Sequence, residues 1–120
     1  MQYNIKGTGV PVTDELRTYV EKCLAHADKF LANDSAAHAD VELEHAPVRD
    51  GDKYRAEFTV SASGELYRAD AWGETLHAAL DLSSGELTKE LRRTKSKRID
   101  VVRRSALKVK EYIRGWRKRV

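Results

Sequence analysis

Basic residues crowd into one short stretch near the end of this sequence. Six of the ten residues from position 89 to position 98 are Lys or Arg, and one is acidic. Cationic side chains without acidic neighbours neutralise phosphates and release the counterions that condense on a polyanion. This stretch therefore predicts the binding of nucleic acid phosphates, by Lys89, Arg92, Arg93, Lys95, Lys97 and Arg98.

Charge divides the whole chain into two unequal parts. Residues 85–120 hold fourteen Lys or Arg against four Asp or Glu, a net charge of +10, whereas residues 1–84 hold eight against fifteen, a net charge of −7. A run of bases on a helix is usually a solvated face, but such a face normally carries acids as well. Because the acids are scarce here, the pattern favours a polyanionic partner, either nucleic acid or an anionic membrane surface.

Length and composition predict one domain. The chain has 120 residues, 41% hydrophobic and 34% charged, which is enough for a single buried core. The lone Cys23 can form no intramolecular disulfide, which fits a reducing compartment. No apolar run approaches the roughly 18 residues of a transmembrane span, and the first residues lack the regions of a signal peptide. We predict a cytoplasmic protein.

The sequence offers little that points to catalysis or to a metal. His45 and His77 have no evident nucleophile beside them, and neither a Gly-rich phosphate loop nor a paired acid–base signature occurs. We therefore predict no enzymatic activity, no cofactor and no metal. One face of a predicted strand carries four residues that could bind a metal: His38, Asp40, Glu42 and Glu44. Salt bridges to Arg55 and Arg68 on neighbouring strands are the simpler explanation for these residues.

Alternating apolar and polar residues predict four strands, each with one buried face. The first strand ends at Gly7, and a turn at Ser63-Gly64 separates the last two strands. The predicted strands are residues 1–6, 38–45, 54–60 and 65–73.

Apolar residues at helical spacing predict two helices. Thr13 can cap a helix that runs to about Phe30, and Thr75 can cap a helix that runs to about Thr94. The resulting order, β-α-β-β-β-α, predicts an α+β two-layer sandwich, in which both helices cover one face of a four-stranded sheet. The first two strands should be parallel, because a helix joins them, and the other pairs antiparallel.

Several segments together resemble a known family, the short ribosome hibernation-promoting factors and ribosome-associated inhibitor A. The resemblance covers roughly residues 1 to 97 and rests on order and spacing rather than on one motif. The segments are the opening MQYNIKG, Val12 to Arg17 with Tyr19-Val20, Gly64 to Asp81 with Ala78-Ala79-Leu80-Asp81, and Leu87 to Lys97.

This resemblance implies translational silencing without catalysis. It implies that residues 1–97 form a ribosome-binding domain, which sits between the head and body of the small ribosomal subunit, with its basic helices on ribosomal RNA where messenger and transfer RNAs would lie. The partners that it implies are small-subunit rRNA and the whole ribosome.

The first helix departs from the family pattern. Where the family usually has two lysines in mid-helix, this chain has Cys23 and His26, so the RNA contact on this helix is expected from Arg17, Lys22 and Lys29. The second helix departs too, because Ser83-Ser84-Gly85 stands in place of bulky apolar residues. Gly85 costs about 1 kcal/mol relative to Ala in a helix interior, which predicts a local weak point.

Residues 98–120 are predicted to be a basic amphipathic extension. Their apolar residues recur at intervals of three and four, a heptad pattern that would suit self-association. The bordering positions carry bases and no acids, so two copies would repel each other, and we predict a monomer when free. The apolar side of this extension is expected to pack on the domain or on a ribosomal protein. Its bases are then expected to contact RNA, and they are Arg103, Arg104, Lys108, Lys110, Arg114, Arg117, Lys118 and Arg119.

An alternative function stays open at this point. The chain could be a basic adaptor whose C-terminal helix docks on a protein partner or on an anionic membrane surface, with the domain as its scaffold. Cosedimentation with ribosomes, as opposed to binding to liposomes, distinguishes the two.

Overall fold

The computed structural model describes residues 1–31 and 34–95, and this part of the chain follows the predicted order β-α-β-β-β-α. The predicted extension at residues 98–120, like Lys97, lies outside the described residues. The described elements are β1 (Gln2–Thr8), α1 (Asp14–Asp28), β2 (His38–His45), β3 (Tyr54–Ala62), β4 (Glu65–Gly73) and a second helix over residues 76–95.

Within the described residues the strands form one four-stranded sheet in the order β1-β2-β3-β4. β1 is parallel to β2, while the β2–β3 and β3–β4 pairs are antiparallel, as the sequence predicts. The strand ends differ slightly from the prediction. β1 does not end at Gly7 but runs on to Thr8, because Gly7 pairs with Leu43, and the lack of a Cβ lets the carbonyl of Val10 come close to Gly7.

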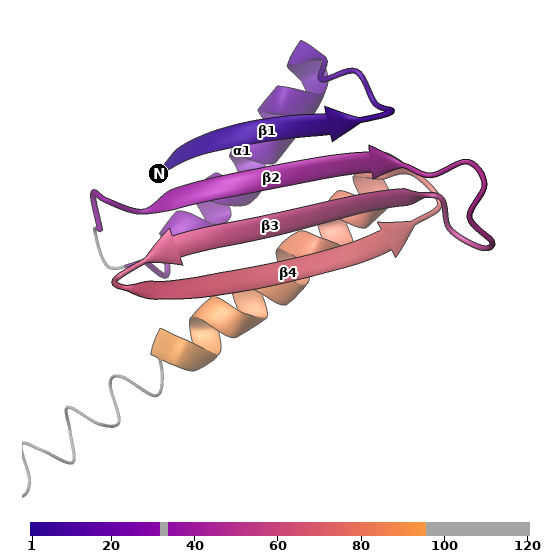
Figure 1. Ribbon diagram of the computed structural model, residues 1–120. Coiled ribbons are helices and arrows are strands. Elements are labelled where there is room, and N and C mark those ends of the chain that lie inside the picture. The colour runs from indigo at the N-terminus through magenta and orange to yellow at the C-terminus, as the bar shows by residue number, and fades with distance from the viewer. Residues whose placement is uncertain (32–33, 96–120) are drawn as a thin grey trace, which may run out of the picture.

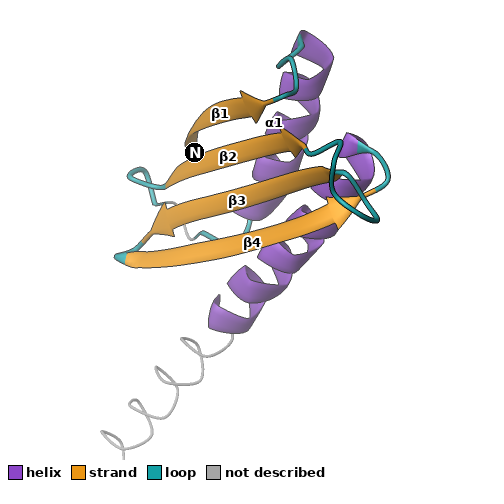
Figure 2. Ribbon diagram, turned by 45° about the vertical axis from the view of Figure 1, so that its right-hand side comes forward, coloured by secondary structure: helices purple, strands orange, loops and turns teal. Residues whose placement is uncertain are grey.

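The two described helices cover the same face of the sheet, and they run in the same direction (Figures 1 and 2). The core lies between these two layers, because the inward residues of the strands meet the apolar stripes of the helices. Phe58 at the centre of β3, Val20 of α1 and Leu80 of the second helix are fully buried. The prediction of a two-layer α+β sandwich is confirmed.

Local hydrogen bonds place the start of each helix where the sequence predicts it. The hydroxyl of Thr13 accepts from the backbone N–H of Leu16 at 3.2 Å, and the hydroxyl of Thr75 accepts from that of Ala78 at 3.1 Å. These N-caps satisfy N–H groups that have no partner within the helix. Both helices therefore begin beside the ends of β1 and β4, and both C-terminal ends lie on the other side of the domain (Figure 1).

Small residues let the two helices pack closely at their middle. Ser83 is fully buried within the apolar stripe, and its hydroxyl donates to the carbonyl of Leu80 at 3.2 Å. Ser84 makes a hydrogen bond with Cys23 of α1, although burial is the larger influence and raises the pKa of the Cys23 thiol. The departures from the family pattern in the two helices are therefore neighbours in space, and the helix runs on through residues 83–85.

Gly85 offers a direct test of the predicted weak point. The residue is exposed in the middle of the second helix, and a Cβ added there would meet nothing within 4 Å. We expect Gly85→Ala to raise the free energy of unfolding by about 0.5–1 kcal/mol, because Ala loses less backbone entropy on folding. Urea unfolding followed by circular dichroism measures this change.

Gly73→Ala is the matched control for that measurement. A Cβ at Gly73 would lie 2.6 Å from the backbone nitrogen of Ala79, so this substitution should destabilise the fold. If Gly85→Ala destabilised the domain instead, the helix could not be regular at this position.

Candidate nucleic-acid interface

The bases of the second helix point away from the core. Lys89, Arg92, Arg93 and Lys95 are all exposed, while Leu87 and Leu91 of the same turns are buried. The spacing of the residues explains this division, since about 100° of rotation per residue carries these bases off the apolar stripe. Of the six bases that the sequence places together, Lys97 and Arg98 lie outside the described residues.

Phe30 joins the basic end of the second helix to α1. Its ring centroid lies 5.7 Å from Cζ of Arg92 and 6.0 Å from Nζ of Lys95. His26, one turn earlier, packs edge-on against the same ring with a centroid distance of 6.1 Å. The C-terminal ends of the two helices therefore meet around one aromatic side chain.

The bases of α1 fall on two different sides of the helix. Lys22, His26 and Lys29 are exposed and follow each other at intervals of four and three, so they share one side next to Phe30. Arg17 lies on the other side, next to β1. There Tyr3 donates a hydrogen bond to Glu21, which raises the pKa of Tyr3, whereas the hydrogen bond from Arg17 lowers it. The structure thus places Lys29 directly before Phe30 and Lys22 on the same side of α1, whereas Arg17 lies beside Tyr3 of β1.

Arg93 also differs from its neighbours. Its guanidinium lies 3.3 Å from the carboxylate of Glu90, one turn earlier on the same helix. This exposed pair partly neutralises Arg93. We define the basic surface as five exposed bases on the C-terminal halves of the two helices: Lys22, Lys29, Lys89, Arg92 and Lys95.

Contacts between the helices fix the geometry of this surface. The hydroxyl of Tyr19 on α1 donates a hydrogen bond to Asp81 of the second helix, and the Tyr19 ring packs edge-on against His77 at 4.7 Å. The hydrogen bond to Asp81 is the main reason that the pKa of Tyr19 is raised to about 12. Asp81 is thereby engaged with a neutral partner and not with a base of the basic surface.

The raised pKa of Tyr19 predicts a specific alkaline titration. Because the folded-state pKa lies above the unfolded value of about 10, the hydrogen bond stabilises the fold fully below pH 10 and is lost as the pH rises through 12. Absorbance of tyrosinate should show one tyrosine ionising near pH 12. Asp81→Asn should move this component towards pH 10, and Tyr19→Phe should remove it. A titration curve that Asp81→Asn left unchanged would contradict the contact.

With this geometry in place, the chain can be compared with known proteins. A family model described as Sigma 54 modulation protein / S30EA ribosomal protein matches residues 3–99. The chain belongs to this family. Among its relatives, the ribosome hibernation promotion factor of Picosynechococcus is 38% identical to this S30EA family member over 98 residues, which are 81% of this chain and 50% of that protein.

A shorter relative and a solved structure agree with this placement. The ribosome hibernation promoting factor of Azotobacter vinelandii is 31% identical over 100 residues, which cover 83% of this family member and 88% of that protein. The crystal structure of the Thermus thermophilus Protein Y N-terminal domain aligns with a TM-score of 0.69 and 32% identity, covering 78% of this chain and 99% of that one. The chain spans about half the length of several curated relatives.

The open face of the sheet in this S30EA family member carries the opposite charge. Arg55 lies at the centre of a group of carboxylates there: it contacts Glu57, and it lies 3.2 Å from Asp70 and 3.8 Å from Glu44. Arg68 lies 3.8 Å from Glu57, not beside the carboxylates of β2, because β3 separates β2 from β4. This acidic network faces away from the helices, so it lies on the side of the sheet opposite to the helices that carry the basic surface.

The four potential metal ligands of β2 do not converge in the family member. His38 pairs with Asp40 at 3.2 Å, and Glu44 is engaged with Arg55. Among residues 1–31 and 34–95, no group of three or more His, Cys, Asp or Glu side chains is arranged to hold a metal ion. In the same described part of the chain, no helix is long and apolar enough to cross a membrane.

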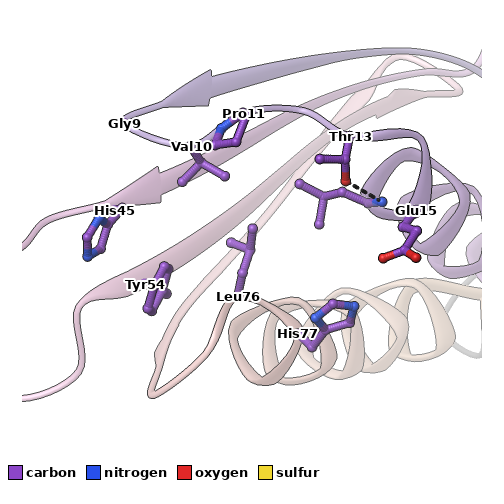
Figure 3. Close-up of a pocket in the computed structure, with 10 residues that line it drawn as sticks. Gly9, Val10, Pro11, Thr13, Glu15, His45, Tyr54, Leu76 and His77 are labelled. Carbon is purple, nitrogen blue, oxygen red and sulfur yellow. Dashed lines mark hydrogen bonds between the residues drawn. The ribbon is translucent and has the colours of Figure 1, made fainter.

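A pocket of about 310 Å³, shown in Figure 3, is lined by residues from the N-terminal turns of both helices, so it lies at the opposite end of the helices from the basic surface. It opens between the N-terminal turns of the two helices and the ends of β1 and β2. Two of its lining residues, His45 and Tyr54, stack on each other with ring centroids 4.6 Å apart. The hydroxyl of a third, Thr13, is already engaged as the cap of α1. Its remaining walls are Gly9, Val10, Pro11, Glu15, Leu16, Leu76 and His77.

The sequence did not single out Phe30 as a site residue, although the structure places it beside Arg92 and Lys95 of the basic surface. The available signal was an aromatic residue directly after Lys29 at the end of a basic helix. Periodicity alone assigns such a residue to the core, because its phase lies next to the buried stripe.

Proposed function

We propose that this chain binds ribosomal RNA of the small subunit through the basic surface, occupies the channel of messenger and transfer RNA, and so silences idle ribosomes. One observation carries the proposal. Exposed bases from two helices meet at one end of the domain, while the acids of the described sheet face lie on the opposite side. Phosphates can therefore approach one side and are repelled from the other.

Membership of the S30EA family supports this choice of polyanion, since relatives carry the name of ribosome hibernation promotion factors. The observed geometry also refines the set of contacts. Lys22, Lys29, Lys89, Arg92 and Lys95 act together, whereas Arg17 and Arg93 stay proposed contacts of lesser weight, because each has a partner within the protein.

Cosedimentation with purified ribosomal subunits tests the proposal. The chain should pellet with small subunits at low salt, and its affinity should fall steeply as salt is raised. For about five phosphate contacts the slope of log affinity against log salt should be roughly −3 to −5. Pelleting with anionic liposomes but not with small subunits would instead support the adaptor function.

The order of addition tests the mechanism. In a cell-free translation reaction, the protein should inhibit more strongly when it is added before initiation than after it, because bound messenger and transfer RNAs exclude a competitor from the channel. Equal inhibition of ribosomes that already carry peptidyl-transfer RNA would rule out simple occlusion.

Residues 98–120 are proposed to add RNA contacts to this interface. The described residues already form a packed core between the sheet and the helices, so a chain that ends at residue 98 should still unfold cooperatively in urea. It should bind small subunits more weakly and with a shallower salt slope, since eight bases are removed. The complete chain should sediment as a monomer. A tight dimer that dissociates on truncation would show that the extension serves assembly.

A further inference from the structure

Phe30 differs from the other aromatic residues of the domain. Phe58 and Tyr67 are buried on the inward face of the sheet, where they fill the core. Phe30 instead follows the end of α1 and is half-buried, with one part of its ring against the core and the rest among the exposed residues His26, Arg92 and Lys95. An aromatic ring with this setting is partly available to a ligand.

The two cations over the Phe30 ring do not touch it. The 5.7 and 6.0 Å distances to Arg92 and Lys95 lie at the outer limit of a cation–π contact, well beyond van der Waals distance. Trp72 provides the contrast, because Cζ of Arg49 lies 3.7 Å from its ring centroid and covers it. Arg49 therefore covers the Trp72 ring at contact distance, whereas Arg92 and Lys95 lie over the Phe30 ring without contacting it.

This combination matches the chemistry of an unpaired nucleotide. Single-stranded nucleic acids are bound by grooves in which cations follow the phosphates and aromatic rings stack on the bases. Imidazole rings and guanidinium planes can stack in the same way. A base within a duplex is already paired and stacked, so it offers this site only its phosphate.

We propose that Phe30, flanked by His26, Arg92 and Lys95, is a stacking site for an unpaired RNA base. The inference rests on the proposed function, because it concerns the same basic surface, and it adds that the RNA bound there is single-stranded at this point. Lys29 and Lys89 then hold the neighbouring phosphates. Stacking on one aromatic ring should contribute about five- to hundredfold to the affinity for a single strand.

A fluorescent RNA tests the proposal directly. The probe is a single-stranded RNA of about twelve nucleotides with one central 2-aminopurine, whose fluorescence is quenched when the base stacks. The complete chain should quench it on binding at low salt. The matched probe is the same strand annealed to its complement, in which the base is already stacked, so that binding should produce little further quenching.

Substitutions separate stacking from a structural role. Phe30→Leu keeps an apolar side chain and should lose the quenching and about five- to hundredfold of the single-strand affinity, with duplex affinity unchanged. Phe30→Tyr keeps the ring and should retain both. Trp72→Leu removes the aromatic side chain that Arg49 already covers, and it should behave like the unsubstituted protein.

The remaining outcomes overturn either the stacking site or the proposed function. A saturated complex of the unsubstituted protein without quenching would overturn it, whether or not any variant folds. Equal losses of single-strand and duplex affinity in Phe30→Leu would assign Phe30 to bracing the two helices. Ribosome cosedimentation without quenching would overturn the stacking site alone, whereas quenching without cosedimentation would overturn the proposed function alone.

Discussion

Replacing Lys89 and Arg92 together by Glu should lower the affinity for small ribosomal subunits by at least about 50-fold. The change removes two phosphate contacts and adds two negative charges that repel the RNA. Both side chains are exposed on the second helix, so the fold should tolerate the change. The slope of log affinity against log salt should become shallower by about two. Filter binding or cosedimentation over a range of salt concentrations measures both quantities.

A control with the same change in net charge makes this result specific. Lys6→Glu with Arg68→Glu also removes two bases and adds two acids, but both residues are exposed on the open face of the sheet. This variant should keep most of the affinity and nearly all of the salt slope. If both double variants lost affinity equally, net charge and not the basic surface would govern binding. Arg93→Ala should cost less than Arg92→Ala, because Glu90 already pairs with Arg93.

Phe58→Ala should have the largest effect on stability, about 3–5 kcal/mol out of a total that is typically 5–15 kcal/mol. Phe58 is fully buried at the centre of β3, and its cross-strand neighbours on the inward face are Val41 and Ala69. Because Ala69 is small, little can move into the space that the ring leaves. Urea unfolding followed by circular dichroism should therefore show a much lower midpoint.

Leu66→Ala is the control for this loss of apolar volume. Leu66 is 66% exposed on β4, so its truncation should change the free energy of unfolding by no more than about 0.5 kcal/mol. If Phe58→Ala lowered the free energy of unfolding by less than about 2 kcal/mol, the helices would have to move towards the sheet and fill the cavity, which contradicts the close packing around Phe58.

The sequence predicted the fold well because its signals are local. Thr13 and Thr75 mark both helix starts, and their hydroxyls make the predicted capping bonds. The turn at Ser63-Gly64 is also present, with φ angles of 52° and 75°. Two consecutive positive values are what a type I′ hairpin turn requires, and Gly64 accepts its value without strain.

The site was harder to predict because it depends on how the helices pack. Sequence spacing sorts residues around one helix, but it does not say that Arg92 and Lys95 lie beside Phe30, more than sixty positions away in the chain. The separation of Arg17 from Lys22 and Lys29 also needs the position of β1. By contrast, the Arg93–Glu90 pair is three residues apart on one helix and could have been predicted from spacing alone.

The parallel pairing of β1 with β2 has a consequence for the order of folding. Every pair in this ladder joins residues 36 positions apart, as in Gln2 and His38, whereas the innermost β3–β4 pair joins Ala62 and Glu65. Closing a long loop costs more chain entropy than closing a short one, so pairing β1 with β2 is the more costly step. We expect the β2–β3–β4 meander to assemble first and β1 to complete the sheet last. In pulsed hydrogen exchange during refolding, the amides of β1 should become protected after those of β3.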